Sequence, residues 1–286
     1  MFDKIAVIGA GTMGTGVSSD LLLKGYEVTL VDINQEQLNE ARREIKNVIR
    51  MAPLLIKNMK ALDVKAVLNK LTLTTRLSDI KECDFVIENI SEKKEAKFKL
   101  YEELDQLMNK EVCFGVNTSC ISITEVAAHT NRSDKIIGIH FMNPVYLKDA
   151  VEVIRGFYTS DACIEIVREF LASIQKKVIL VNDYPGFVAN RISHLFMNEA
   201  AYVVQDQVAD AKQVDDIFKE CYGHSMGPLE TADLIGLDVV VDSLNVLYES
   251  YQDQKFRCCP LLKKLVSAGC LGKKTGKGFY TYHDFI

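Results

Sequence analysis

The sequence predicts an α/β domain built on a doubly wound, mainly parallel sheet, followed by an all-α C-terminal domain. Through the first third of the chain, short apolar runs alternate with segments of helical spacing, which is the pattern of parallel strands connected by helices. A glycine-rich turn follows the first apolar run. From Phe187 to Ser267, by contrast, apolar residues recur at helical spacing and strand signals are few.

The expected elements follow one another in β-α-β order. The first strand is Lys4–Ile8, and the second is Glu27–Val31, which ends at Asp32. Helical spacing extends over 15–24, 35–51 and 92–108, and further buried strands are expected over 85–90, 112–116 and 136–139. Pro53 is expected to interrupt the second helix. Because parallel strands are usually buried on both faces, we expect helices to cover this sheet.

A turn-rich stretch, Asn182–Gly186, marks the change between the two kinds of pattern. We place the domain boundary at about residue 184, which gives a nucleotide-binding domain over 1–184 and a helical domain over 185–286. Two domains also suit a chain of 286 residues.

Composition excludes several classes of protein. The net charge of −5 argues against a nucleic-acid partner, and no apolar run approaches the ~20 residues of a membrane helix. The N-terminus lacks the basic and small-residue pattern of a signal peptide. None of the eight cysteines forms a C-x-x-C pair, so we expect no metal site. We therefore expect reduced thiols and a cytoplasmic protein.

The glycine-rich turn is the sequence Gly9-Ala10-Gly11-Thr12-Met13-Gly14, which matches G-x-G-x-x-G. It follows a predicted strand and opens a predicted helix, and Asp32 ends the next strand eighteen residues after Gly14. This context is typical of a Rossmann-like dinucleotide site, in which a helix N-terminus holds the pyrophosphate. Asp32 suits a ribose 2′-hydroxyl and would repel a 2′-phosphate, so NAD is expected rather than NADP. Two alternatives to an NAD site are a glycine turn without a ligand and an FAD site.

Polar residues also follow two later strands. Asn117 and Ser119 come after the strand that ends at Val116, and His140 and Asn143 follow the run that ends at Ile139. Strand C-termini converge on one crevice in a doubly wound sheet, so these four side chains should line the nicotinamide site.

Histidine suits the abstraction of a hydroxyl proton near neutral pH. Glu152, in a later apolar run, could fix the tautomer of His140. The alternatives are a structural histidine at His140 and a surface charge at Glu152.

Together these segments resemble the 3-hydroxyacyl-CoA dehydrogenase family along essentially the whole chain. The matching motifs are 7–14, 117–119, 140–144, 151–154, 185–191, 226–230 and 276–280. The resemblance implies a Rossmann-like domain and a helical domain that forms a homodimer. It implies that His140 is the general base with Glu152 as its paired carboxylate, and that Ser119 and Asn190 bind the substrate. The NAD contacts that it implies are Asp32, Glu92, Lys97, Asn143 and Lys274. Without the family, Asn190 is equally a residue that starts a helix.

The chain departs from the usual family pattern near the expected crevice. Cys120 stands where a second Ser is usual, Met142 replaces Phe, and Asp149 replaces Lys. The segment Glu88-Asn89-Ile90-Ser91 replaces small and apolar residues. We expect these changes to act on the choice of substrate.

The variants resemble the branch of the family that oxidises a glyceryl group on acyl carrier protein to make hydroxymalonyl or methoxymalonyl extender units for polyketides. An acidic carrier protein would need a basic docking surface. The clusters Lys93-Lys94-Lys97-Lys99 and Lys263-Lys264 with Lys273-Lys274 are candidates, and solvated helix faces are the alternative.

Two other functions stay open. The first is a 3-hydroxybutyryl-CoA dehydrogenase of fatty-acid or butyrate metabolism, whose substrate is carried on CoA. The second is an NAD-binding protein without catalytic activity, which would have no need for the set of Ser119, His140 and Glu152.

Overall fold

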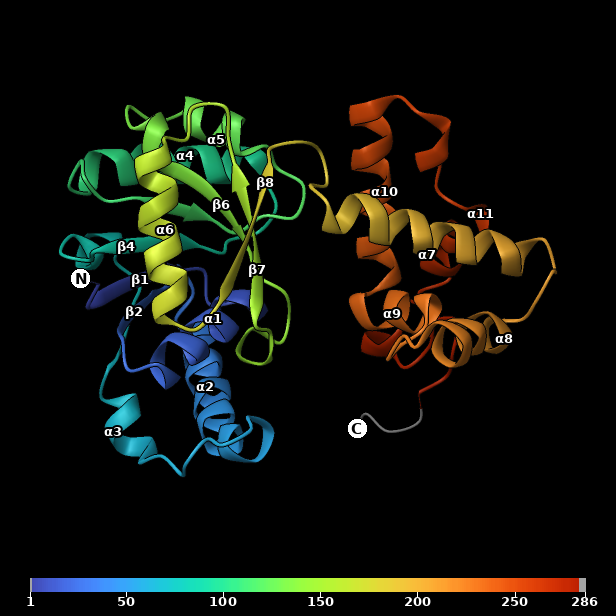
Figure 1. Ribbon diagram of the computed structural model, residues 1–286, viewed down its shortest axis with the longest axis horizontal. Helices are drawn as coiled ribbons and strands as arrows, with labels where there is room; N and C mark the ends of the chain where they lie inside the picture. The colour runs from blue at the N-terminus through green and yellow to red at the C-terminus, as the bar shows by residue number, and fades with distance from the viewer. Residues whose placement is uncertain (1, 283–286) are drawn as a thin grey trace. The chain divides into compact units, whose positions relative to one another are not determined.

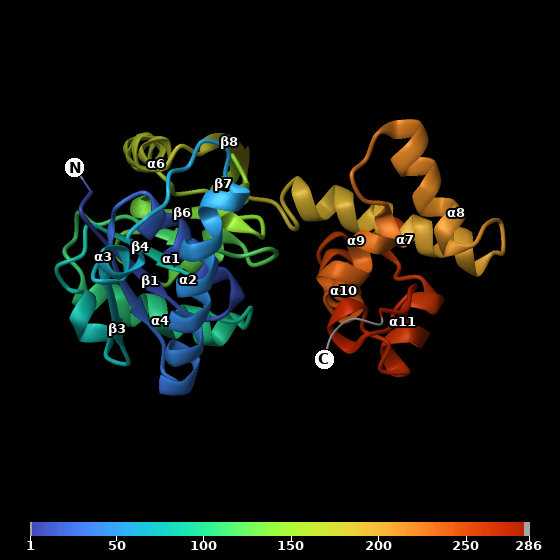
Figure 2. The ribbon, with the colours of Figure 1, turned by 90° about the horizontal axis from the view of Figure 1, so that it is seen from below.

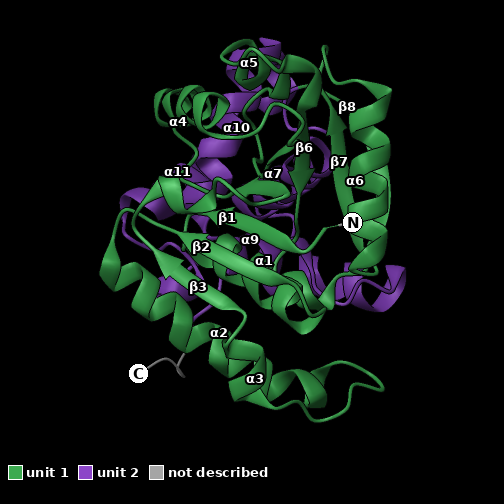
Figure 3. Ribbon diagram, turned by 90° about the vertical axis from the view of Figure 1, so that its left-hand side faces the viewer, with its two compact units in different colours: residues 1–184 green, residues 185–286 purple. Residues whose placement is uncertain are grey.

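The computed structural model describes residues 2–282 and divides the chain into two compact units, Met1–Tyr184 and Pro185–Ile286. The first unit is a mainly parallel eight-stranded sheet with helices, and the second is helical (Figures 1 and 3). The predicted fold class is therefore confirmed. Among the described residues, no helix is both long and apolar enough to cross a membrane.

The sheet has the strand order β3-β2-β1-β4-β5-β6-β7-β8. Its strands are β1 (Lys4–Ile8), β2 (Glu27–Val31), β3 (Leu71–Thr74), β4 (Phe85–Glu88), β5 (Phe114–Val116), β6 (Ile136–His140), β7 (Ala150–Arg155) and β8 (Lys177–Asn182). All neighbouring pairs are parallel except β6 and β7. The order reverses direction at β1 and β4, and this is where a doubly wound sheet opens its ligand crevice.

Helices cover both faces of the sheet. They are α1 (Thr12–Leu23), α2 (Gln35–Leu55), α3 (Val64–Leu68), α4 (Lys94–Leu107), α5 (Ile123–Ala128) and α6 (Asp161–Ser173). The helices α4 and α6 lie on opposite sides of the strands (Figures 2 and 3). Phe170 of α6 stacks on Phe85 of β4 with ring centroids 4.7 Å apart, within a core that α1 and α2 share.

Helix α2 differs from the prediction at Pro53, which lies inside the helix and does not interrupt it. Proline loses its donation to the carbonyl four residues earlier, and its ring crowds that carbonyl. Pro53 lies two residues from the end at Leu55, so these costs fall on the last turn of the helix. Asn34 is the N-cap of α2, because its side chain accepts hydrogen bonds from the backbone N–H groups of Glu36 and Gln37.

The second unit is built from helices around its own core. They are α7 (Ala189–Gln205), α8 (Ala211–Asp216), α9 (Pro228–Ile235), α10 (Leu237–Tyr251) and α11 (Pro260–Ser267). The buried Asp233 carboxylate accepts hydrogen bonds from the N–H groups of Phe279 and Tyr280, at 3.0 Å each. This carboxylate ties the C-terminal segment to α9.

Candidate active site

The glycine turn after β1 is shaped for close approach of a ligand. Gly9 has φ +96°, and a Cβ there would lie 2.6 Å from the carbonyl oxygen of Asn89. A Cβ at Gly14 would lie 1.7 Å from the carbonyl oxygen of Gly9. Only glycine fits these positions. Helix α1 then starts at Thr12 with no acidic residue in its first turn, so its N-terminal N–H groups are suited to an anion.

A cavity of about 910 Å³ adjoins this turn, and Asp32 lies on its wall. The Asp32 carboxylate accepts hydrogen bonds from Ala10 N at 2.8 Å and from Asn34 N at 2.9 Å. These contacts fix its orientation and leave further lone pairs for hydroxyl donors. The turn, the cavity and the carboxylate together fit the pyrophosphate and ribose of a dinucleotide.

His140 and Glu152 face each other across the antiparallel pair β6/β7, where they occupy opposite register positions. Both side chains are buried, and His140 Nδ1 lies 2.8 Å from Glu152 Oε2. An ionised carboxylate can only accept, so Nδ1 carries the proton and Nε2 presents its lone pair. Ser119 Oγ lies 3.2 Å from this Nε2. The structure therefore brings Ser119, His140 and Glu152 together in one line.

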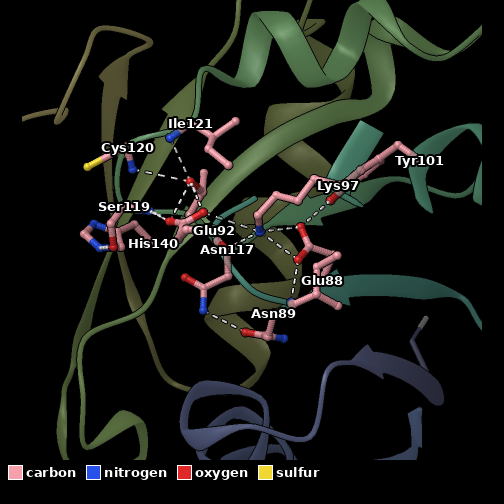
Figure 4. A network of polar contacts seen from close by, with 12 residues as sticks. Glu88, Asn89, Glu92, Lys97, Tyr101, Asn117, Ser119, Cys120, Ile121 and His140 are labelled. Carbon is pink, nitrogen blue, oxygen red and sulfur yellow. Dashed lines mark hydrogen bonds and ion pairs between the residues drawn. The ribbon is translucent and has the colours of Figure 1, made fainter. Parts of the chain in front are cut away.

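The turn that carries Ser119 is held by Glu92 (Figure 4). Glu92 accepts a hydrogen bond from Thr118 Oγ1 at 2.9 Å and one from Ser119 N at 2.5 Å. Glu92 binds Ser119 through its backbone N–H, so the Ser119 hydroxyl can contact His140. In this structure Glu92 therefore orients the site, and its predicted contact with NAD stays a prediction.

Lys97 is completely buried, so its inclusion in a basic surface cluster was wrong. Its ammonium group donates to both Glu88 oxygens, at 2.7 and 2.9 Å, and to the carbonyl oxygen of Asn117 at 3.1 Å (Figure 4). These three bonds use all three of its donors. Burial raises the pKa of Glu88, and the charge of Lys97 opposes that rise. Lys97 thus holds the backbone of Asn117, just after the end of β5, in place. Its contact with NAD remains a prediction.

An amide chain joins the ends of three strands. Asn117 Nδ2 donates to Asn89 Oδ1 at 2.7 Å (Figure 4). Asn117 Oδ1 accepts from Phe141 N at 3.3 Å. Asn89 Nδ2 in turn donates to the carbonyl oxygen of Ile87 at 3.2 Å. Because a backbone group closes each end of the chain, both amide orientations are determined. That Asn89 orients Asn117 could not be predicted from the sequence, because only strand pairing brings the two residues together.

Asn143 lies on the wall of a second cavity, of about 630 Å³, which also touches Gly11 and Thr12. The loop after Asn143 is held by Lys176, a residue that the sequence reasoning missed. Lys176 Nζ donates to the carbonyl oxygens of Val145 at 2.7 Å and Lys148 at 2.6 Å, and it lies 3.0 Å from the Asp20 carboxylate.

Two predicted site residues belong to the second unit. Asn190 lies in the first turn of α7, and Lys274 Nζ lies 2.6 Å from the Asp238 carboxylate. Their contacts with substrate and NAD stay predictions.

Comparisons with known proteins agree over the whole chain. Residues 4–184 match the model described as 3-hydroxyacyl-CoA dehydrogenase, NAD binding domain, and residues 186–282 match 3-hydroxyacyl-CoA dehydrogenase, C-terminal domain. The chain is 42% identical to a 3-hydroxybutyryl-CoA dehydrogenase of Bradyrhizobium diazoefficiens, covering 98% of this chain and 95% of the relative. It is 40% identical to a protein of the same name from Clostridioides difficile, covering 98% and 99%.

A solved structure shows the same likeness. The (S)-3-hydroxybutyryl-CoA dehydrogenase PaaH1 from Ralstonia eutropha superposes with a TM-score of 0.92 at 35% identity, covering 99% of this chain and 100% of that one.

Proposed function

We propose that this chain, which belongs to the 3-hydroxyacyl-CoA dehydrogenase family, oxidises the 3-hydroxyl group of 3-hydroxybutyryl-CoA. The chain is an NAD-dependent oxidoreductase that acts on the CH–OH group of a 3-hydroxyacyl-CoA. The choice of a short acyl group on CoA is supported by the names of the relatives. It replaces glyceryl-acyl carrier protein as the leading proposal.

The observation that best supports the proposal is the hydrogen-bonded series Glu152–His140–Ser119. His140 Nε2 is the acceptor in this line, and a substrate hydroxyl placed beside Ser119 Oγ can give its proton to it. Glu152 then faces an imidazolium at 2.8 Å, and its negative charge stabilises that cation in a buried site. Bound NAD supplies the acceptor for the hydride that leaves C3. Ser119 Oγ also offers a hydrogen bond to the substrate oxygen, which orients it toward His140.

The experiment that tests this proposal compares thioester with free acid. Purified protein and NAD are incubated with 3-hydroxybutyryl-CoA or with free 3-hydroxybutyrate, and NADH formation is followed by absorbance. We expect rapid turnover of the CoA thioester and little of the acid. Absence of turnover with the thioester would refute the proposal.

The narrower function, oxidation of a glyceryl group on acyl carrier protein, stays a second candidate. It is supported by polar residues beside the site, above all the Asn89 amide on the wall of the cofactor cavity and Cys120 next to Ser119. A site built to bind an added hydroxyl can reject a substrate without it. Mass spectrometry of glyceryl-loaded carrier protein, treated with the enzyme and NAD, would show a loss of about two daltons on oxidation; no loss would remove this candidate.

The homodimer and the cytoplasmic location also remain proposals. Exposed apolar side chains on the second unit support an association through that unit, among them Ile217, Leu234 and Val239. Sedimentation equilibrium would show twice the mass of 32.1 kDa for a dimer, and cell fractionation would test the location.

A further inference from the structure

Asp183 follows strand β8 and lies two residues before Pro185, where the second unit begins. Its carboxylate binds the start of helix α5. The Asp183 Oδ2 atom accepts hydrogen bonds from Ser122 Oγ at 2.7 Å, Thr124 N at 2.8 Å and Thr124 Oγ1 at 2.6 Å. The other oxygen, Oδ1, is buried and has no hydrogen-bond partner among residues 2–282. Every hydrogen bond that this carboxylate accepts in the described chain therefore comes from one short turn.

That turn ends the segment that carries Ser119. Ser122 is the N-cap of α5, and it comes three residues after Ser119. At the front of the segment, Glu92 accepts hydrogen bonds from Thr118 Oγ1 and from Ser119 N (Figure 4). The segment is thus bound by a carboxylate at each end. Glu92 fixes where it begins, and Asp183 fixes where it ends and α5 starts.

Asp183 is also connected to the strands that carry the other half of the site. Its backbone N–H donates to the carbonyl oxygen of Arg155 at 3.0 Å, which extends the parallel pairing of β7 with β8 beyond the last register pair. Strand β7 holds Glu152 opposite His140 of β6. Through its backbone and its side chain together, this one residue joins the His140–Glu152 pair to the segment of Ser119.

We propose that Asp183 is a positioning residue of the dehydrogenase reaction, which sets the place of Ser119 Oγ relative to His140 Nε2. This inference rests on the proposed function, in which a substrate hydroxyl lies beside both atoms. The two atoms are 3.2 Å apart, and a displacement of about 1 Å at a reacting group can cost about a hundredfold in rate. Without the Asp183 carboxylate, the end of the segment loses three hydrogen bonds, while the contacts of Glu92 at its front remain.

The variant Asp183→Ala removes these three contacts, and steady-state kinetics with 3-hydroxybutyryl-CoA and NAD measure the effect. We expect kcat to fall by about tenfold or more, because the Ser119 hydroxyl no longer keeps its place beside His140. The KM for NAD should change by less than about twofold, because the variant leaves the glycine turn and Asp32 untouched.

Asp84→Ala is the matched control. Asp84 Oδ2 accepts hydrogen bonds from Asp3 N at 2.8 Å and Lys4 N at 2.9 Å, at the beginning of β1. Because β1, β4 and β5 are parallel, this is the opposite edge of the sheet from Ser119. Both variants delete a carboxylate that binds backbone N–H groups, so both should unfold at a lower temperature. The kcat of Asp84→Ala should nevertheless equal that of the wild type.

Thr124→Val tests the same contact from the other side. Valine is close to threonine in size and keeps the backbone N–H, so this variant should fold even if Asp183→Ala does not. It removes one hydrogen bond to Asp183, and kcat should fall by about threefold. Thr124→Ser keeps the hydroxyl group and should restore the wild-type kcat.

A double-variant comparison asks whether Asp183 acts through Ser119. In a Ser119→Ala background, Asp183→Ala should lower kcat by less than about twofold further, because the hydroxyl that it positions is already gone. A further loss of about tenfold would show that the two residues act independently, and it would overturn the proposal.

Amide hydrogen exchange gives a readout that does not depend on activity. Asp183→Ala should speed exchange over residues 118–126 by about tenfold or more, and Asp84→Ala should leave it unchanged. If the wild type oxidises no 3-hydroxybutyryl-CoA, the proposed function fails, while exchange in Asp183→Ala still shows whether the carboxylate holds the segment. If the wild type is active, an unchanged kcat or an unchanged exchange rate in Asp183→Ala overturns the positioning role.

Discussion

Replacing Lys97 with Met should destabilise the protein strongly, because it leaves the Glu88 carboxylate buried without its counter-ion. Both side chains are fully buried. After the substitution, Glu88 keeps only the Ile90 N–H at 2.6 Å and the Tyr101 hydroxyl at 3.4 Å as donors. Removal of one partner of a buried ion pair typically costs about 3–5 kcal/mol. We expect a loss of that size in the free energy of unfolding at pH 7.5.

The pH dependence of this loss has a definite sign. Burial already raises the pKa of Glu88 from its ordinary value of 4.5, and loss of the Lys97 charge raises that pKa further. A carboxyl group with a raised pKa in the folded state costs stability as pH rises through that pKa. Acidification should therefore restore stability to Lys97→Met, by at most about 2.7 kcal/mol between pH 7.5 and 5.5, at 1.36 kcal/mol per pH unit.

Urea unfolding followed by circular dichroism at both pH values measures this effect. The double variant Glu88→Gln/Lys97→Met is the matched control, because it removes both charges and should recover most of the stability with no pH dependence in this window. A loss below about 1 kcal/mol in the single variant, or a double variant no more stable than the single one, would refute the reasoning.

Three further predictions concern the site. Glu152→Gln should lower kcat by about tenfold or more, because the amide can hold His140 in the wrong tautomer and does not stabilise an imidazolium; pre-steady-state kinetics would show the loss in the chemical step. Asp32→Ala should weaken NAD binding in fluorescence titrations by about tenfold, since the ribose loses its acceptor. Asn89→Ala should raise the KM for NAD and lower stability by about 1–3 kcal/mol, because Asn117 Nδ2 loses its partner; unchanged values would exclude a positioning role.

Three features could be predicted from the sequence, because each follows from local pattern or strand order: the strand–turn–helix unit at Gly9, the place of Asp32 after β2, and the proximity of Ser119 and Glu152 to His140. The catalytic roles of these three residues stay a proposal. The sequence did not allow β8 to be predicted. Lys177–Asn182 is largely exposed, and an edge strand of this kind is defined by its neighbour.

The residues that support the site were also hidden in the sequence. Lys97 looks like one member of an exposed lysine cluster, and only the fold shows that it is buried against Glu88. Lys176, which immediately precedes β8, reaches the loop after Asn143, a contact between segments about thirty residues apart. Such contacts depend on tertiary packing, which overrides local propensity.

The most direct test of the central claim is the turnover of His140→Gln with 3-hydroxybutyryl-CoA and NAD. If Nε2 of His140 accepts the hydroxyl proton, kcat should fall by about 10²–10⁴-fold, while NAD affinity and the unfolding midpoint stay those of the wild type. Turnover near the wild-type rate would contradict the assignment of His140 as the base.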